Sequence, residues 1–225
     1  MAEEHTNKVE LIGFYGGDLE HSLSAWTSTS RDLDPEKRAR IPALLAKLAK
    51  DGHHTPFEKS MLHFLVTCDQ ATHIHIIKHR IGVCVNGESA RYKELKEDRF
   101  YLPTDWPEVE VQRYMDHMWS SFEKYHRALA NLTPILGRKR AKESARFYLP
   151  YGSQITLDIS FNFRSFMHFQ GLRNDDHAQN EVHEVASRML ELVWGTEAFN
   201  ASLAAFGWLT KPWVSPIIEK APEGA

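Results

Sequence analysis

The stretch at residues 78–94, KHRIGVCVNGESARYKE, combines cationic side chains with a turn of small polar residues. Lys78, His79 and Arg80 lead through a short apolar run into the segment NGESARY. A turn of small residues lets backbone N–H groups approach an anion closely. The guanidinium of Arg91 adds a planar fork that matches phosphate oxygens. The stretch therefore predicts a local binding site for an anionic ligand.

A second stretch, NFRSFMHFQGLRNDDHAQNE at residues 162–181, mixes aromatic and apolar residues with polar ones. Its polar members include Asn162, Arg164, His168, Arg173 and His177. Three of them, Arg164, His168 and Arg173, recur at intervals of four and five residues. The stretch is too polar for a core stripe and too apolar for a solvated face. We interpret it as the wall of a cleft.

Three histidines, His73, His75 and His79, lie in the segment HIHIIKH. His75 and His79 are four residues apart, the spacing with which two zinc ligands share one face of a helix. However, an isoleucine follows His75 where helical zinc proteases carry their general-base glutamate. The chain contains 13 histidines, so such a cluster can also arise by chance. Two interpretations stay open: a metal-dependent hydrolase centre, or a row of histidines that faces solvent or substrate.

The two cysteines, Cys68 and Cys84, form no CxxC pair and no repeated spacing. The sequence thus indicates neither a zinc knuckle nor a disulfide framework. Cys84 is the candidate nucleophile near charged residues. Because Val83 and Val85 flank it, we expect a small buried apolar residue instead.

The basic run GRKRAKESAR at residues 137–146 is typical of a solvated helix face. Arg146 is the exception, because it directly precedes the apolar segment FYLPYG. We expect its side chain to point inward.

Hydrophobic periodicity predicts the elements that must position these residues. Strands are expected at 9–16, 60–68 and 155–161, where apolar residues alternate or run up to glycines. Helices are expected at 35–51, 70–81, 107–132, 138–148, 164–172, 177–194 and 196–206. Asp34 and Pro35 mark the start of the first helix, Gly52 its end, and Pro107 and Pro134 bound the longest one. The tail from Lys211 is expected to be extended. The fold class is α+β: a helix-rich single domain over residues 1–225 with a small antiparallel or mixed sheet.

Composition restricts the function classes. A make-up of 42% hydrophobic and 25% charged residues is ordinary for a soluble globular protein. The net charge of -3 argues against a general nucleic-acid-coating protein, and no nucleic-acid partner is expected. The first ten residues lack the pattern of a signal peptide, and no apolar run approaches the roughly 18 residues that a membrane span needs. We expect a cytoplasmic protein.

Four separated segments resemble the flavin-dependent thymidylate synthase family. They are DGHHTPFEK (51–59), KHRIGVCVNGESARY (78–92), SARFYLP (144–150) and NFRSFMHFQGLRNDDHAQNE (162–181). They occur in the order of the family's motifs, and we refer to them as the four matched segments. The sequence departs from the family pattern at several points: Lys78 replaces an arginine, eight residues instead of seven separate Arg80 from Ser89, and Gly87, His75 and His168 replace common family residues.

The resemblance implies a homotetramer with active sites between subunits. It implies the reductive methylation of dUMP to dTMP, with FAD as cofactor and with NADPH and methylenetetrahydrofolate as co-substrates. The reduced flavin would supply a hydride to the uracil ring without attack by an enzyme thiolate. No resident metal is implied. The KHR end would face the flavin, and the GESAR turn would bind the nucleotide phosphate.

The resemblance also assigns residues one by one. Residues that match dUMP-binding positions or lie beside them are His75, Lys78, Gly87, Glu88, Ser89, Ala90, Arg91, Arg146 and Arg173. Residues that match FAD-binding positions or lie near the flavin are Ser30, His53, Thr55, Lys78, His79, Arg80, Ile81, Asn162, Arg164 and His168. Arg173 would act in catalysis near the pyrimidine edge, where its permanently protonated guanidinium would stabilise negative charge on the uracil.

Two other functions remain as alternatives at this point. One is the metal-dependent hydrolase built on His73, His75 and His79. The other is a flavin- and nucleotide-binding protein that has lost catalysis through the motif departures.

Overall fold

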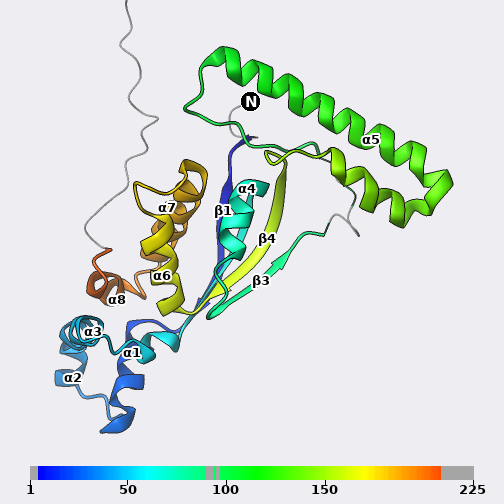
Figure 1. The fold of residues 1–225 in the computed structure, drawn as a ribbon. Coiled ribbons are helices and arrows are strands. Elements are labelled where there is room, and N and C mark those ends of the chain that lie inside the picture. Colours follow the sequence, from blue (N-terminus) through cyan, green and yellow to red (C-terminus); the bar gives the residue numbers. More distant parts are fainter. Residues whose placement is uncertain (1–4, 90–93, 95–96, 209–225) are drawn as a thin grey trace, which may run out of the picture.

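A four-stranded antiparallel sheet forms the centre of the protein, which is seen here in a computed structural model that describes residues 5–89, 94 and 97–208 (Figure 1). The strand order is β1-β2-β4-β3. Their bounds are β1 Lys8–Tyr15, β2 Met61–Asp69, β3 Val83–Gly87 and β4 Gln154–Phe161. Every strand pair is antiparallel, which decides between the two kinds of sheet that the sequence left open.

The period-two pattern of the central strands explains which face is buried. In β2, Leu62, Phe64 and Val66 are fully buried, while the intervening residues are only half-buried. In β4, Leu157, Ile159 and Phe161 are likewise buried. Full burial of each such side chain contributes roughly 1.5–3 kcal/mol to stability. The expected strands at 60–68 and 155–161 are therefore confirmed, with their apolar face toward the core.

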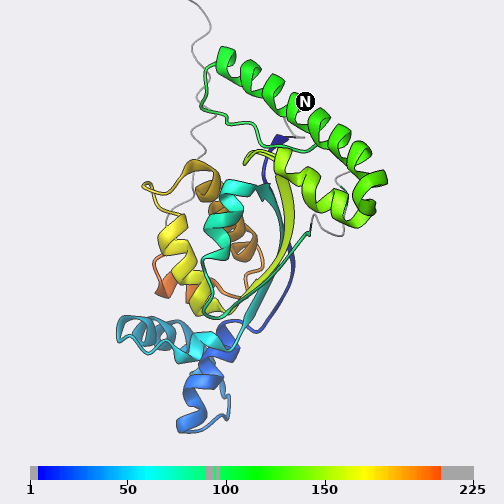
Figure 2. The ribbon, with the colours of Figure 1, turned by 45° about the vertical axis from the view of Figure 1, so that its right-hand side comes forward.

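Three helices cover the apolar face of the sheet: α4 Gln70–Ile77, α6 Phe163–Arg173 and α7 Asn180–Trp194 (Figure 2). Aromatic rings fill the interface, and those of Phe64 and Phe166 stack with centroids 5.7 Å apart. The two ribbon views show no helix on the opposite face within the described ranges. On that face His63 Nε2 and Asp158 Oδ1 lie 2.7 Å apart across β2 and β4.

The remaining helices gather at the two ends of the sheet (Figure 1). At one end lie α1 Asp18–Ala25, α2 Pro35–Ala39, α3 Ile41–Lys50 and α8 Asn200–Ala205. At the other end lies α5 Glu108–Ala145. Short 3-10 turns lie between these elements at η2 Trp26–Ser28, η3 Thr55–Glu58 and η4 Arg146–Tyr148. No described helix is both long and apolar enough to span a membrane.

Several predicted helix bounds are wrong. The helix expected at 70–81 ends at Ile77, so Lys78, His79 and Arg80 lie in the connection to β3. The edge strand β3 was not predicted, because it pairs with β4 alone and most of its residues are exposed. Cys84 is therefore exposed and not buried as expected.

Within α5, Gly137 with φ 75° is not helical and separates two helical parts, as expected for 107–132 and 138–148, except that the first part continues through Pro134. The break folds the helix back on itself, so that Tyr125 and Leu129 pack against Ala141 and Ala145. This packing holds the two helical parts together as a hairpin.

Near the N-terminus the helix expected at 35–51 is divided at Arg40 into α2 and α3. Pro42, in the first turn of α3, lacks the N–H that a continuous helix would need at that point. Helix α1 was not predicted, and the last two helices are shorter than expected. The tail from Lys211 lies outside the described residues.

Candidate functional site

A cavity of about 860 Å³ opens where β3 ends and β4 begins. Gly87, Glu88 and Ser89 of the second matched segment line it together with Arg146 of the third. The structure brings these four predicted ligands to one cavity, although Ser89 and Arg146 are 57 positions apart in the chain. The wall also includes residues that the sequence reasoning did not assign to the nucleotide: Gln70, His73, Phe147, Leu149, Pro150, Tyr151, Ser153, Gln154 and Ile155. Phe147, Leu149 and Pro150 belong to the third matched segment, so the motif itself could have identified them, whereas Tyr151, Ser153 and Gln154 lie outside the four matched segments.

The polar turn that follows β3 is hydrogen-bonded to β4 through Glu88, the first residue after β3. The backbone N of Glu88 donates to Thr156 O at 2.8 Å, and Glu88 Oε2 accepts from Thr156 N at 3.1 Å. Arg99 Nη2 lies 3.7 Å from the same carboxylate oxygen. These contacts fix where the turn leaves the sheet. Ala90 and Arg91, the next two predicted ligands, lie outside the described residues.

Arg146 begins η4, directly after the end of α5. Its side chain lines the cavity although the residue as a whole is exposed. Within the described ranges no carboxylate forms an ion pair with it. A cation without a protein counter-ion beside a small-residue turn is suited to an anionic ligand.

A second cavity, of about 590 Å³, opens at the other end of the β3–β4 pair, where α6 begins. Ile81, Asn162, Arg164 and His168 line it, as the sequence predicted for one common ligand. Its further lining residues are His54, Glu58, Ser165, Met167, Gly171, Leu172 and Phe206. His54 and Glu58 come from the first matched segment, so the motif itself could have identified them.

Contacts between the matched segments shape this second cavity. Arg164 Nη1 lies 2.5 Å from Glu58 Oε1 and so joins the first and fourth segments. The backbone N of Asn162 donates to Gly82 O at 2.9 Å, which joins the second and fourth. Asn162 also caps α6, because its Oδ1 accepts from Ser165 N at 2.8 Å. The chain thus brings a guanidinium, an imidazole and apolar side chains to one opening.

Arg173, the predicted catalytic residue, lies at the C-terminal end of α6 and contacts His79. Its Nε donates to His79 Nε2 at 3.1 Å. The His79 ring packs against Phe169 and His168, with centroids 5.0 and 6.0 Å away. Burial, with smaller electrostatic contributions from Arg173 and His168, lowers the pKa of His79 to about 4. His79 is therefore neutral at physiological pH.

Arg173, His79 and the remaining described residues that the sequence predicted as ligands are not lining residues of either cavity. Four of them are exposed residues of the first two matched segments: His53, Thr55, Lys78 and Arg80. Ser30 Oγ donates to Asp32 Oδ2 at 2.8 Å, away from both cavities. Their proposed roles remain predictions.

The three clustered histidines have three different environments. His73 lines the first cavity, His75 Nε2 lies 3.1 Å from Gln179 Oε1, and His79 accepts from Arg173. In the part of the chain that the structure describes, no three His, Cys, Asp or Glu side chains are placed to hold one metal ion.

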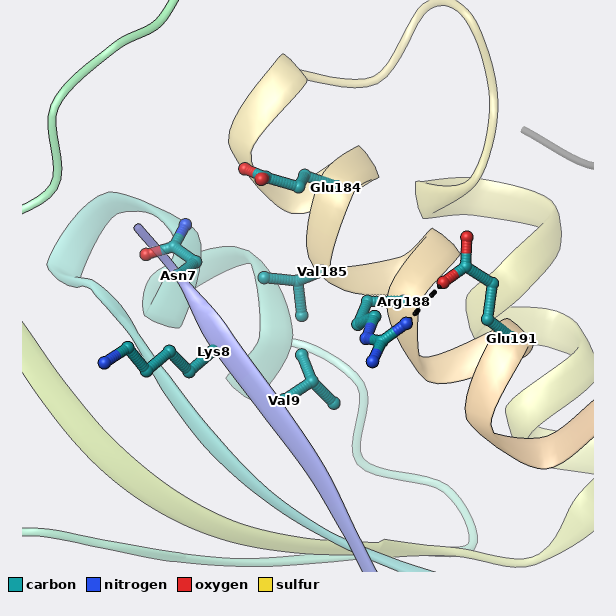
Figure 3. A pocket seen from close by; sticks show the side chains of 7 residues that line it. All are labelled: Asn7, Lys8, Val9, Glu184, Val185, Arg188 and Glu191. Atoms are coloured by element: carbon teal, nitrogen blue, oxygen red, sulfur yellow. Dashed lines mark hydrogen bonds and ion pairs between the residues drawn. The ribbon is translucent and has the colours of Figure 1, made fainter. Parts of the chain in front are cut away.

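A third cavity, of about 330 Å³, lies between β1 and α7 and is lined by no residue of the four matched segments (Figure 3). Arg188 Nη1 there contacts Glu191 Oε2 at 2.8 Å. Burial raises the pKa of Glu184, whose Oε2 accepts from Tyr101 Oη at 3.4 Å. Arg188 and Glu191 thus pair with each other, and Glu184 is hydrogen-bonded to Tyr101. The cavity is separate from the two cavities of the candidate site.

Comparisons with known proteins agree with the grouping of the matched segments. The family model described as thymidylate synthase complementing protein matches residues 11–196. A flavin-dependent thymidylate synthase of Pseudothermotoga lettingae is 32% identical over 203 residues, which cover 85% of this chain and 89% of that protein. The one from Streptomyces coelicolor is 30% identical and covers 86% of this chain and 91% of its own length.

Among solved structures, the UMP/dUMP methylase PolB from Streptomyces cacaoi, bound with 5-Br dUMP, is similar with a TM-score of 0.76. It is 27% identical, and the match covers 90% of this chain and 95% of PolB. The family match extends over all four matched segments and over the elements that carry both cavities. The chain belongs to the thymidylate synthase complementing protein family, whose members include the flavin-dependent thymidylate synthases.

Proposed function

We propose that this enzyme methylates dUMP reductively to dTMP. In this proposal methylenetetrahydrofolate donates the carbon, and FAD reduced by NADPH is the hydride source. The observation that carries the proposal is the convergence of the four matched segments on two cavities at opposite ends of the β3–β4 pair. The flavin-dependent names of the relatives support the cofactor.

The first cavity is suited to the nucleotide. Gly87 and Ser89 offer small-residue backbone at its edge, and Arg146 offers a guanidinium without a carboxylate partner in the described chain. Together with Arg91 they would bind the phosphate of dUMP. Because the phosphate is charged before and after the reaction, these contacts orient the substrate and contribute to its affinity. Arg173 would face the uracil, where a fixed cation stabilises negative charge as it develops.

The second cavity fits the chemistry of a flavin. Ile81, Met167 and Leu172 provide apolar contact for a ring system, and Arg164 and His168 provide donors for its polar edge or phosphates. Asn162 fixes the position of Arg164 by capping α6. Bound and reduced, FAD would supply the hydride. The residues of the cavity would hold it in place and exclude water.

Neither cysteine is placed to act as a nucleophile. Cys68 is fully buried in β2, and burial together with Asp69 raises the pKa of its thiol. Cys84 is exposed on β3 and is not a lining residue of either cavity. This placement supports a route that does not use an enzyme thiolate.

We also propose a homotetramer with active sites between subunits. Exposed apolar side chains support association, among them Tyr15 and Met61 at one end of the sheet and Phe147 beside the first cavity. Light scattering after size exclusion measures the mass. A monomer of 25.9 kDa at micromolar concentration would contradict this part of the proposal.

One observation favours a second substrate. The similar solved structures are of a methylase named for both UMP and dUMP, one of them bound with 5-Br UMP. Assays with UMP and dUMP in parallel separate the two substrates. The hydrolase alternative is not favoured by any relative.

The test of the function begins with the visible absorption spectrum of the purified protein after incubation with FAD. We expect a stoichiometric flavin spectrum that NADPH bleaches under anaerobic conditions. Addition of dUMP and methylenetetrahydrofolate should then restore the oxidised spectrum and yield dTMP. Flavin uptake without dTMP would favour a binding protein that has lost catalysis. A protein that binds no FAD would contradict the proposal as a whole.

A further inference from the structure

The hydrogen bond between Arg173 and His79 has a direction that chemistry fixes. A guanidinium has five N–H donors and no acceptor. The 3.1 Å contact from Arg173 Nε therefore requires a lone pair on His79 Nε2. The imidazole must be neutral, with its proton on Nδ1. The lowered pKa of His79, about 4, agrees with this form.

The His79 ring itself packs against two aromatic residues of α6, one buried and one exposed. It lies edge-on to Phe169, which is fully buried, with centroids 5.0 Å apart and planes at 75°. His168 contacts the ring from the same helix at 6.0 Å. His79 thus has little freedom to rotate, so it can define the plane of a neighbouring group.

The bond uses only the Nε–H of Arg173. The two terminal nitrogens of a guanidinium lie in the same plane as Nε and form the fork that binds an anionic or carbonyl oxygen. A contact at Nε fixes this plane while the fork stays available. Arg side chains carry about 2 kcal/mol of rotamer entropy, and an enzyme must remove that freedom before the reaction to gain from the cation.

We propose that His79 is a positioning residue that fixes the guanidinium plane of Arg173 toward the substrate. This inference rests on the proposed function, because it assigns Arg173 to the uracil. It also gives the central histidine of the KHR stretch a role that direct contact with the flavin does not supply.

The test distinguishes the hydrogen-bond acceptor of His79 from the packing of its aromatic ring. His79→Phe keeps an aromatic ring against Phe169 but removes the lone pair, while His79→Gln keeps an acceptor at a similar reach. Both are made in the wild-type and in the Arg173→Ala background, at saturating FAD and with flavin content measured. His117→Gln, an exposed histidine on α5 outside both cavities, is the matched control.

We expect His79→Phe to lower kcat at saturating dUMP by about 10-fold, as for a lost hydrogen bond to a charged group. His79→Gln should recover most of this loss, and His117→Gln should match wild type. In the Arg173→Ala background, His79→Phe should have no further effect on kcat, because the group it positions is gone. If His79→Phe does not fold, His79→Met replaces it as the variant without a strong acceptor.

An equal loss in both backgrounds would overturn the inference, as would a His79→Gln variant as slow as His79→Phe. If wild type and His117→Gln bind FAD but form no dTMP, the proposed function fails instead, and the inference fails with it. The two failures are thus distinguishable by the wild-type assay.

Discussion

The cations of the candidate site differ in what surrounds them. Arg164 is paired with Glu58, and Arg173 is bound by a neutral histidine. Arg146 lines the first cavity without a carboxylate in the described chain. A cation paired with a protein carboxylate has less to offer a ligand than one that is not, so Arg146 and Arg173 are better suited to substrate contact than Arg164.

Truncation of Arg91 and truncation of Arg173 should change different kinetic parameters. Arg91→Ala should mainly raise the KM for dUMP, by about 10-fold or more, because a phosphate contact is present equally in the ground and transition states. Arg173→Ala should lower kcat by about 10²–10³-fold even at saturating dUMP. Steady-state kinetics with flavin content as control measure both effects. A pure KM effect for Arg173→Ala would reassign this residue to binding alone.

Cys84→Ala should leave turnover nearly unchanged. The thiol is exposed on an edge strand, so the free energy of unfolding should change by no more than about 0.5 kcal/mol. The measurements are kcat with saturating substrates and urea denaturation. A folded, FAD-loaded Cys84→Ala protein without activity would show that a thiolate takes part in the reaction.

At the scale of elements, one tight contact joins β3 to α6. Gly82 has φ +65°, and its carbonyl accepts from the backbone N of Asn162. A Cβ on Gly82 would lie 2.3 Å from Asn162 Nδ2 and 2.4 Å from Ser165 Oγ. The close approach holds the start of β3 against the helix cap that carries the second cavity.

Gly82→Ala should therefore destabilise the protein by more than the cost of placing an alanine in the positive-φ conformation of Gly82. Gly137→Ala is the matched control, because Gly137 has a similar φ of +75° but no atom within 4 Å of its Cβ position. We expect about 1–3 kcal/mol for Gly137→Ala from the positive-φ backbone alone. Gly82→Ala should cost more than that and should also weaken FAD binding. Equal losses of unfolding free energy would show that the cap can move aside freely.

At the scale of the whole molecule, a buried polar chain joins three distant parts of the sequence. Ser60 Oγ lies 2.7 Å from His21 Nε2, and His21 Nδ1 lies 2.8 Å from Ser202 Oγ. Ser202 Oγ donates to Asp18 Oδ1 at 2.6 Å, so it accepts from His21. These contacts connect α1, α8 and the start of β2. Burial lowers the pKa of His21 to about 4.

The shifted pKa makes stability depend on pH in a defined direction. His21 must stay neutral in the folded state but binds a proton below its ordinary pKa of 6.5 in the unfolded state. Its contribution is complete above pH 6.5 and is lost as the pH falls toward 4. Between pH 7 and pH 5 we expect a loss of about 2 kcal/mol from this group. Asp18, whose pKa burial raises, acts in the opposite direction at lower pH.

Comparison with His21→Gln isolates this effect. Urea unfolding at fixed protein and FAD concentration should show a smaller fall in unfolding free energy between pH 7 and pH 5 for His21→Gln than for wild type. His117→Gln, whose side chain is exposed, should keep the wild-type slope. Identical slopes in all three proteins would mean that His21 is not the group that titrates.

The sequence by itself determined the features that depend on local pattern. Alternation of apolar residues located β2 and β4 and their buried faces, because a strand exposes every second residue to the same environment. Motif order identified the family and predicted one ligand for Gly87, Glu88, Ser89 and Arg146, which the structure places around one cavity.

Only the tertiary structure decided the features that depend on distant partners. Edge strand β3 exists because β4 offers it hydrogen bonds, and five mostly exposed residues carry no pattern that reveals this. The hairpin of α5 passes Pro134 because packing across the break at Gly137 outweighs local preference. The bond from Arg173 to His79 spans 94 residues, and no spacing in the sequence encodes a contact that arises when a loop and a helix end meet across the core.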